Sequence, residues 1–454
     1  MPNVLSVITD LAEASAALTR RRGFAETQLS TPMREGVRRV FGADLSAEAV
    51  VDRILTDVRA DGDAAVLRYT EAFDGARPDP IEVPRAAWDA ALAGLDPPLR
   101  DAMELAADQI AAFHRKQLRT SWIDYSDEGA LGQIVRPLER IGIYTPGGTA
   151  VYPSSLLMTA VPAKVAGVED VIVCSPPSGG AVSPLTLAAA RIAGVDRLFQ
   201  VGGVQAIGAL AFGTETIPHV DKILGPGNIF VVLAKQRVYG VVAIDQLPGP
   251  TETLLVADGS ADPALVAADM LAQAEHDPMA SAVLVTIDEG LVAPILTALR
   301  DQLDALDRRE IAAQALAANG LIVVAPDLST AMGLANAYAP EHLCLLLRDP
   351  WRAVPLVKHA AGVFVGEHSP EALGDYTAGP SHVMPTGGTA RFSSPIHVGD
   401  FTKVISLAAA NEAALRRLGP ATIALAHAEG LGGHAAAIER RLAKGRPATG
   451  ETAV

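Results

Sequence analysis

Cysteine and aromatic residues are both scarce in this chain. Its 454 residues include two cysteines, Cys174 and Cys344, each within an apolar run, and only 4% of the residues are aromatic. Two cysteines exclude a disulfide framework and a cysteine-rich metal cluster. We expect both side chains to be small buried hydrophobic groups in a protein of the reducing cytoplasm. Because 49% of the residues are hydrophobic, we expect a large core that consists mainly of aliphatic and alanine side chains.

Basic stretches and long apolar runs are absent as well. Lys and Arg number 37 against 52 Asp and Glu, which gives a formal net charge of −15. An acidic chain without a basic patch is a poor candidate for binding nucleic acid or an anionic membrane. No uninterrupted apolar run reaches the length of about 18 residues that a membrane helix needs, and the N-terminus lacks the basic and apolar segments of a signal peptide. We therefore predict a soluble, cytoplasmic protein.

Short apolar runs alternate with helical stretches from Ile141 onward. This alternation is typical of a parallel sheet with helices on both faces. It runs once up to the Pro- and Gly-rich stretch at 245–252 and again after Thr251. The sequence therefore predicts an α/β fold with two Rossmann-like, doubly wound units, the larger one discontinuous. The predicted helices cover residues 47–59, 99–118, 155–167, 184–193, 204–212, 264–276, 291–303, 328–337 and 351–359.

Four segments follow from this pattern. Residues 1–34 are predicted to be an N-terminal helical segment, and residues 397–454 a C-terminal helical segment. Residues 35–143 together with 251–396 are predicted to form the larger α/β domain, and residues 144–250 the smaller one. A C-terminal segment of about 55 residues is too short to bury a core alone. It must therefore pack on the rest of the chain or on another subunit.

Glycine-rich loops follow three predicted strands of the smaller domain. They are YTPGGTAVYPSS at 144–155, VGGVQAIGALAFGT at 201–214 and LGPGN at 224–228. Backbone N–H groups in such loops can bind an anion at the start of a helix, and three loops at one sheet edge favour a ligand crevice. The first loop is not the GxGxxG dinucleotide fingerprint, and an ordinary tight turn explains it equally well.

Histidines and carboxylates gather in the second half of the chain, where eight of the ten histidines follow residue 270. An adjacent Glu and His could act as general bases, and solvated polar surface is the alternative at each place. Neither the GxSxG motif of hydrolases nor the HExxH motif of zinc proteases is present. The groups are Gln273 with His276 on one face of a predicted helix, Glu341 with His342 before a predicted strand, Asp375 with His382 in a glycine-dense loop, and Glu429 with His434 in the helical tail.

Taken in order, these motifs resemble those of the histidinol dehydrogenases. The resemblance implies a zinc-dependent, NAD-linked homodimer with shared active sites. Such an enzyme oxidises L-histidinol to L-histidine through the aldehyde, in the last two steps of histidine biosynthesis. The resembling segments span Arg140 to His434 and are RIGIYTPGGTA, VGGVQAIGALAFGT, KILGPGN, LPGPTETLLVAD, AQAEHDP, APEHL, GDYTAGPSH and AEGLGGH.

The resemblance also implies ligands for one Zn²⁺ per active site. Gln273, His276 and Asp375 match three of the family's metal ligands, and His434 matches a fourth that the family contributes from the partner subunit. The larger domain would then carry the zinc, and the helical end segments would pack across the dimer. This mixed nitrogen and oxygen set leaves room for donors from the substrate better than a closed cysteine site does.

Glu341 and His342 match the family's catalytic pair. The resemblance implies that His342 takes the alcohol proton while hydride leaves to NAD⁺, and that it acts as a base again in the second hydride transfer. Glu341 is implied to activate the water that hydrates the aldehyde. Neither cysteine is given a role.

The remaining matches concern the substrate and the cofactor. Thr251 stands where a serine is expected, but it retains the hydroxyl. The positions that match substrate contacts are Ser154, Thr251, His382 and Glu429, together with Gln273, His276, His342, Asp375 and His434. The positions that match NAD contacts are Tyr144, Gln205 and Asn228, which makes the smaller domain the NAD-binding one.

Two other functions compete with this interpretation. A paralogue of the same fold that oxidises another small alcohol, such as a sulfonated propanediol, would keep the zinc ligands and the Glu-His pair. His382 and Glu429 suit a cationic amino alcohol with an imidazole, and so favour histidinol. A catalytically inactive binding protein of this fold is disfavoured, because every expected ligand and base is present.

Overall fold

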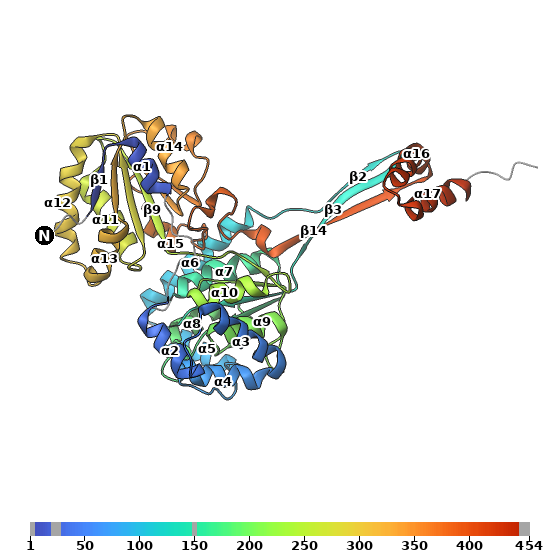
Figure 1. Ribbon diagram of the computed structural model, residues 1–454, viewed down its shortest axis with the longest axis horizontal. Helices are drawn as coiled ribbons and strands as arrows, with labels where there is room; N and C mark the ends of the chain where they lie inside the picture. The colour runs from blue at the N-terminus through green and yellow to red at the C-terminus, as the bar shows by residue number, and fades with distance from the viewer. Residues whose placement is uncertain (1–4, 20–28, 148–151, 445–454) are drawn as a thin grey trace, which may run out of the picture. The chain divides into compact units, whose positions relative to one another are not determined.

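The computed structural model describes residues 5–19, 29–147 and 152–444. The chain divides into two compact units: unit 1 comprises residues 1–117 and 138–401, and unit 2 comprises residues 118–137 and 402–454. Figure 1 labels most of the helices and several of the strands of the two units. None of the helices in the described ranges is long and apolar enough to cross a membrane.

Unit 1 contains a five-stranded parallel sheet with helices on both of its faces. Its strands are β4 (Arg140–Tyr144), β5 (Asp170–Cys174), β6 (Arg197–Phe199), β7 (Lys222–Leu224) and β8 (Ala243–Ile244). Its helices are α2 (Thr31–Phe41), α3 (Ala47–Asp61), α4 (Asp63–Asp74), α5 (Arg85–Ala93), α6 (Pro97–Arg115), α7 (Pro153–Ala166), α8 (Pro184–Ile192), α9 (Gly203–Phe212) and α10 (Ile229–Val238). Helices α3, α4, α9 and α10 share the core on one face, and α5 to α8 share the core on the other.

The strand order of this sheet is β6-β5-β4-β7-β8. The chain moves from β4 outward to β6 and then crosses to β7 on the other side of β4. At such a switch point the loops at the carboxyl ends of the two strands diverge and leave a crevice. The predicted cofactor loops follow β4, β6 and β7, and therefore lie at this edge.

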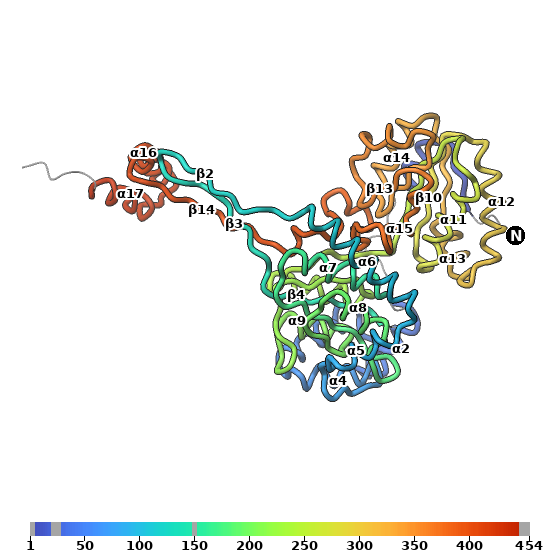
Figure 2. Tube along the Cα trace, turned by 180° about the vertical axis from the view of Figure 1, so that it is seen from behind, coloured from blue at the N-terminus to red at the C-terminus, as the bar shows by residue number. Residues whose placement is uncertain are grey.

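A second parallel sheet, with six strands, completes unit 1. Its strands are β1 (Ser6–Ile8), β9 (Glu252–Ala257), β10 (Ser281–Thr286), β11 (Leu321–Val324), β12 (His342–Leu346) and β13 (Gly362–Val365). Its helices are α1 (Leu11–Thr19), α11 (Pro263–Ala274), α12 (Val292–Leu303), α13 (Arg309–Asn319), α14 (Leu328–Tyr338) and α15 (Glu371–Tyr376). Helices α11, α12 and α13 cover one face and α1 and α14 the other (Figures 1 and 2).

The order of the second sheet is β1-β11-β10-β9-β12-β13, so β9 and β12 are neighbours across its switch point. Every residue of β9 and β12 is buried. Continuous apolar strands of this kind are expected where helices cover both faces of a parallel sheet.

Unit 2 is an antiparallel sheet with a pair of helices. The sheet has the order β14-β3-β2, and Thr402 pairs with Pro137 at one end of its longest ladder. Its strands are β2 (Trp122–Ser126), β3 (Gly129–Pro137) and β14 (Thr402–Ala410), and its helices are α16 (Glu412–Ala428) and α17 (Gly432–Lys444).

This packing differs from the domain division expected from the sequence. The pattern groups residues 35–143 with 251–396, but α3 to α6 pack on the five-stranded sheet instead. The segment 1–34 contributes β1, which pairs with β11, and the segment 397–454 contributes β14 besides its helices. Hydrophobic periodicity shows which face of a helix is buried, but it does not show which sheet the face covers.

One predicted helix is wrong. Residues 351–359 form two short 3₁₀ turns, Pro350–Arg352 and Val354–Leu356, in place of a helix. Pro355 explains the difference, because a proline inside a helix lacks the N–H for the helical hydrogen bond and clashes with the preceding turn.

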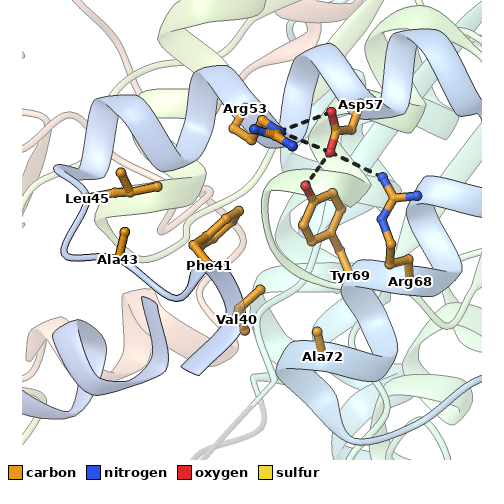
Figure 3. A pocket seen from close by; sticks show the side chains of 9 residues that line it. All are labelled: Val40, Phe41, Ala43, Leu45, Arg53, Asp57, Arg68, Tyr69 and Ala72. Atoms are coloured by element: carbon orange, nitrogen blue, oxygen red, sulfur yellow. Dashed lines mark hydrogen bonds and ion pairs between the residues drawn. The ribbon is translucent and has the colours of Figure 1, made fainter. Parts of the chain in front are cut away.

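A cavity of about 500 Å³ lies beside α2, α3 and α4 (Figure 3). On its polar wall Asp57 accepts a hydrogen bond from the Tyr69 hydroxyl at 2.5 Å and pairs with Arg53 at 3.4 Å and Arg68 at 3.2 Å. Burial raises the pKa of Asp57, but these three partners hold it below its ordinary value. Because the charges on this wall satisfy one another, the cavity's chemistry points to packing and not to ligand binding.

Candidate active site

The amino ends of two neighbouring parallel strands carry the predicted catalytic pair. His342 is the first residue of β12, Glu341 directly precedes it, and Thr253 of β9 is the partner of His342 in the ladder. Thr251 and Glu252 stand at the start of β9. Because the two strands run in the same direction, these five residues meet at one edge of the six-stranded sheet.

Thr251 connects the predicted base Glu341 to the predicted metal ligand Gln273. Nε2 of Gln273 donates a hydrogen bond to the Thr251 hydroxyl at 2.9 Å, and that hydroxyl donates to Oε2 of Glu341 at 2.6 Å. The backbone N–H of Glu252 donates to the same carboxylate oxygen at 3.0 Å. Since the amide nitrogen of Gln273 is engaged in this way, its amide oxygen is the atom that could bind a cation.

The two ring nitrogens of the buried His342 have different surroundings. Nδ1 lies 3.2 Å from the backbone carbonyl oxygen of Glu252, a contact in which Nδ1–H is the donor. Nε2 is buried, has no hydrogen-bond partner among the described residues and lies 3.6 Å from Oδ1 of Asp375. The neutral imidazole with its proton on Nδ1 therefore has a lone pair on Nε2, as a general base requires.

Asp375 and His382 complete this polar cluster. Nδ1 of His382 donates to the backbone carbonyl oxygen of Asp375 at 2.7 Å, and Nε2 of His382 lies 3.0 Å from the hydroxyl of Ser155. Ser155 is in the first turn of α7, a helix of the five-stranded sheet. Through this contact, a helix that packs on the five-stranded sheet reaches the polar cluster at the six-stranded sheet.

Burial and neighbouring charges shift the pKa values of the catalytic pair. Burial raises the pKa of the Glu341 carboxyl to about 7. Burial lowers the pKa of His342, but the carboxylates of Glu341, Glu371 and Asp375 outweigh this effect and raise it. The pKa of His342 rises to about 10, so without a bound cation its ring is protonated at neutral pH. A cation held by Asp375 would lower this pKa toward the range that a general base needs.

The pKa values of His276 and Asp375 are both lowered, which favours the deprotonated forms of these two predicted ligands. Burial lowers the pKa of His276. Burial raises the pKa of Asp375, but the neighbouring His342, His382 and His276 outweigh it and hold that pKa below its ordinary value. A neutral imidazole and an ionised carboxylate are the states in which these side chains bind a metal.

The donors of Gln273, His276 and Asp375 fit a divalent cation such as zinc, because they offer a mixed nitrogen and oxygen set. Within the described ranges no group of three or more His, Cys, Asp or Glu side chains is placed to hold a metal ion. The predicted ligand set would not form such a group within unit 1, because Gln273 is an amide and His434 belongs to unit 2.

His276 lies beyond its helix and not on a helical face. Helix α11 ends at Ala274, whereas the predicted helix extends through 276. The chain makes one further turn, in which the N–H of His276 donates to the carbonyl oxygen of Gln273 at 3.4 Å. This turn keeps His276 next to Gln273 although the regular helix has ended.

The predicted cofactor residues lie around the carboxyl ends of the five-stranded sheet. Tyr144, the last residue of β4, is buried, and its hydroxyl accepts the N–H of Gly203 at 3.2 Å. Gly225 packs so closely on β4 that a Cβ would lie 2.1 Å from the carbonyl oxygen of Tyr144. Asn228 caps the start of α10, where its Oδ1 accepts the N–H of Phe230 at 3.1 Å. These close backbone approaches and two helix starts fit a bound pyrophosphate group.

Gln205 of α9 is fully buried near the carboxyl ends of the strands of the five-stranded sheet. Its Nε2 lies 3.5 Å from the hydroxyl of Thr70 on α4, and its Oε1 has no hydrogen-bond partner in the part of the chain that the structure describes. The unpartnered oxygen is thus the atom that a ligand donor could engage.

The remaining predicted residues divide between the two units. Ser154 is partly buried in the first turn of α7. Glu429 directly follows α16 and His434 lies in the first turn of α17, and both side chains are exposed. Unit 1 brings together Gln273, His276, Glu341, His342, Asp375 and His382, whereas Glu429 and His434 belong to unit 2.

Sequence reasoning missed three residues of the cluster, which are Ser155, Glu252 and Glu371. Ser155 adjoins the predicted Ser154, so the loop was recognised but not the residue. Glu252 acts through its backbone, for which a side-chain pattern carries no signal. Glu371 opens the short helix α15, where an acidic residue is usual, and its burial could not be read from that position.

Comparisons with known proteins agree with the family resemblance of the sequence motifs. The model of the histidinol dehydrogenase family matches residues 38–442. The histidinol dehydrogenase of Deinococcus radiodurans is 53% identical over 434 residues, which cover 95% of this chain and 98% of the relative. That of Thermus thermophilus is 53% identical over 405 residues, which cover 89% of this chain and 97% of the relative. A crystal structure of histidinol dehydrogenase from Elizabethkingia anophelis matches with a TM-score of 0.90 and 33% identity, over 98% of this chain and 99% of that one.

Proposed function

The chain belongs to the histidinol dehydrogenase family, and from this premise we propose that it oxidises L-histidinol to L-histidine through L-histidinal, with NAD⁺ as hydride acceptor and one Zn²⁺ per active site. The observation that carries the proposal is the buried pair of Glu341 and His342, in which Nε2 of His342 has no hydrogen-bond partner among the described residues and lies 3.6 Å from Oδ1 of Asp375. We place the reaction in the cytoplasm, where the two free, buried cysteines would stay reduced.

His342 is the base for the substrate hydroxyl. The hydrogen bond from Nδ1 to the carbonyl oxygen of Glu252 fixes the ring and leaves Nε2 as the accepting atom. A hydroxyl that enters beside Asp375 would meet this nitrogen. The three carboxylates that raise the pKa of His342 also stabilise the imidazolium that forms when it takes the proton.

Glu341 acts at the second stage. An aldehyde has no hydroxyl proton until water adds to it, so hydration needs a base of its own. Oε2 of Glu341 already accepts hydrogen bonds from Thr251 and Glu252, which leaves Oε1 to take a proton from water. A carboxyl pKa of about 7 suits this task at neutral pH.

Two groups that must be bound complete the site. When bound, NAD⁺ supplies the hydride acceptor, and Zn²⁺ supplies a fixed positive charge that orients the substrate. Gln273, His276 and Asp375, with His434 of the partner subunit, would hold the metal. The loops at Tyr144 and Asn228 would hold the dinucleotide.

Unit 2 supports a homodimer with shared active sites. Its strands expose large apolar side chains, among which Trp122 is 49%, Tyr125 77% and Leu131 64% exposed. Trp122 and Leu131 share one face of the sheet and Tyr125 lies on the other. Exposed apolar side chains of this size indicate an interface. A second copy of the chain would cover them, and the exposed Glu429 and His434 would reach the substrate and the metal of that copy.

The test is NADH formation by the purified protein with Zn²⁺ and L-histidinol. We expect two NADH for each histidinol consumed, and NADH formation slowed by roughly 10² to 10⁴ in the His342→Ala variant. Turnover of a sulfonated propanediol without turnover of histidinol would contradict the proposed substrate. One NADH per histidinol, with histidinal accumulating, would contradict the four-electron course.

A further inference from the structure

Asp74, the last residue of α4, lies in surroundings that are unfavourable for a carboxylate. Its Oδ2 is buried and accepts no hydrogen bond from any described residue. Burial raises the pKa of Asp74 to about 6. The C-terminal end of a helix also carries partial negative charge, which repels a carboxylate. A buried acceptor without a donor reduces folding stability, so such a residue calls for a functional reason.

The start of α9 lies next to Asp74. Thr70 precedes Asp74 by one turn on the same face of α4, and its hydroxyl lies 3.5 Å from Nε2 of Gln205. Burial raises the pKa of the Tyr144 hydroxyl to about 12, and the charge of Asp74 adds to that shift. That hydroxyl accepts the N–H of Gly203 at the first residue of α9. Asp74, Gln205 and Tyr144 therefore converge on one helix start.

A second unpartnered acceptor in the same place points to a ligand. Gln205 is 0% exposed, and its Oε1 has no partner among the described residues. A ligand that offers uncharged donors would satisfy both acceptors. A phosphate group cannot fill this role, because a carboxylate repels it. The hydroxyls of a ribose can, and a carboxylate that accepts from ribose hydroxyls is a common feature of dinucleotide sites.

The two faces of the five-stranded sheet identify which ribose this would be. Ser155 of α7 reaches the catalytic cluster through His382, and α7 belongs to the core on one face. Helices α4 and α9 belong to the core on the opposite face. The reacting end of a dinucleotide must approach the cluster, so the group beside Asp74 is the far, adenosine end.

We propose that Asp74 binds the adenosine ribose of the dinucleotide and discriminates against a 2′-phosphate on it. Resting on the proposed function, this inference extends it to cofactor selectivity. A 2′-phosphate would bring like charge against Asp74 and would remove one of the hydroxyl donors that its carboxylate accepts.

The experiment is calorimetric titration of NAD⁺ and NADP⁺ into Asp74→Asn and into the unaltered protein. We expect the Kd for NAD⁺ to rise by about tenfold or more, the loss of one hydrogen bond to a charged group. The Kd for NADP⁺ should stay the same or fall. Without ligand, Asp74→Asn should melt at a higher temperature, because a buried unpartnered charge is gone. The control is Glu71→Gln, an exposed position on the same helix that pairs with Arg77, which should leave both Kd values unchanged.

Each outcome bears on a different claim. Unchanged binding of both dinucleotides to Asp74→Asn would overturn this inference alone. An equal loss for NAD⁺ and NADP⁺ would also overturn it, since Asp74 would then shape the site without contacting the ribose. A lower melting temperature would assign Asp74 to folding. If the unaltered protein bound no NAD⁺, the proposed function would fall and this inference with it.

Discussion

The hydroxyl of Thr251 donates a hydrogen bond to Oε2 of Glu341 at 2.6 Å while it accepts one from the side-chain amide of Gln273 at 2.9 Å. One hydroxyl thus orients both the proposed base for water and a proposed metal ligand. A serine offers the same hydroxyl, which explains in physical terms why threonine is acceptable at a position where a serine is expected.

Thr251→Val should therefore impair two properties together. Glu341 would lose a charged hydrogen bond and Gln273 would lose the acceptor that orients its amide. We expect oxidation of supplied histidinal to slow by roughly 10- to 100-fold, the worth of one hydrogen bond to a charged group, and zinc to dissociate more readily. Stopped-flow NADH formation and zinc titration measure the two effects. Thr251→Ser is the matched control and should retain both properties.

His276→Ala tests the zinc site directly. His276 supplies the imidazole donor of the proposed set, so its loss should leave a folded protein with little bound metal and little activity. Elemental analysis of the purified variant measures the metal, and circular dichroism checks the fold. Full zinc occupancy in a folded variant would show that the ligand assignment is mistaken.

The strands of the active site could be predicted from the sequence, but the order in which they lie side by side in the sheet could not. The run LCLLL is apolar at every position and TLLVA at every position after its threonine, which is why β9 and β12 were recognised. Residues 258–341 separate the two strands along the chain, yet they adjoin in the sheet. Only this adjacency places Thr251 beside Glu341. A hydrophobic pattern reports local structure and does not show which distant strands pair. The connection through Thr251 therefore could not be predicted.

The antiparallel sheet of unit 2 illustrates the same limit. Strands β14 and β3 are far apart in the sequence, yet they pair along their full length, from Thr402 with Pro137 to Ala410 with Gly129. Its sequence, TKVISLAAA, contains alanines that fit a helix as well as a strand, and it lies on an exposed sheet where burial gives little alternation. The tail was therefore predicted to be helical, which α16 and α17 confirm only for its later part.

Asp400 should make the stability of unit 1 depend on pH in the acid range. Its carboxylate accepts hydrogen bonds from Lys222 at 2.8 Å and from Nδ1 of His397 at 2.7 Å. Burial raises the pKa of Asp400, but these partners outweigh it and lower the pKa from 3.8 to about 2. A carboxyl with a lowered folded pKa stabilises the protein above its unfolded pKa, and that contribution disappears as the pH falls toward 2.

The corresponding variant is Asp400→Asn. At pH 7 it should lower the free energy of unfolding by about 2 kcal/mol, the equivalent of the shift in pKa, and the difference from the unaltered protein should shrink between pH 4 and pH 2. Denaturant titrations at several pH values measure it. Asp44→Asn, which removes an exposed pair with Arg38, should change stability little at any pH. A constant difference across the acid range would contradict the prediction.

Mixed dimers test whether His434 serves the partner subunit. Chains with His434→Ala and chains with His276→Ala should each be inactive alone. In a heterodimer of shared sites, one site would combine an intact His276 with an intact His434 and the other would lack both. Random mixing makes half of the dimers heterodimers, so about one quarter of the unaltered activity should return. No recovery, with heterodimers demonstrated by mass spectrometry, would mean that each site uses its own His434.

Glu341 and His342 should differ in the half-reaction that each supports. Glu341→Gln should slow oxidation of supplied histidinal and spare the reduction of histidinal to histidinol, because only oxidation requires hydration of the aldehyde. His342→Ala should slow both directions by roughly 10² to 10⁴, the usual contribution of a positioned base. Single-turnover absorbance of NADH measures each direction separately.

The rival to this water mechanism is a covalent route through Cys344. That thiol lies two residues beyond His342 on β12, and alternate residues of a strand share a face. Burial raises its pKa well above the ordinary value, which keeps it protonated and a poor nucleophile. Cys344→Ala should therefore retain aldehyde oxidation in a folded, zinc-loaded protein. If it abolished that step while Glu341→Gln did not, a thiohemiacetal intermediate would have to replace the hydrated aldehyde.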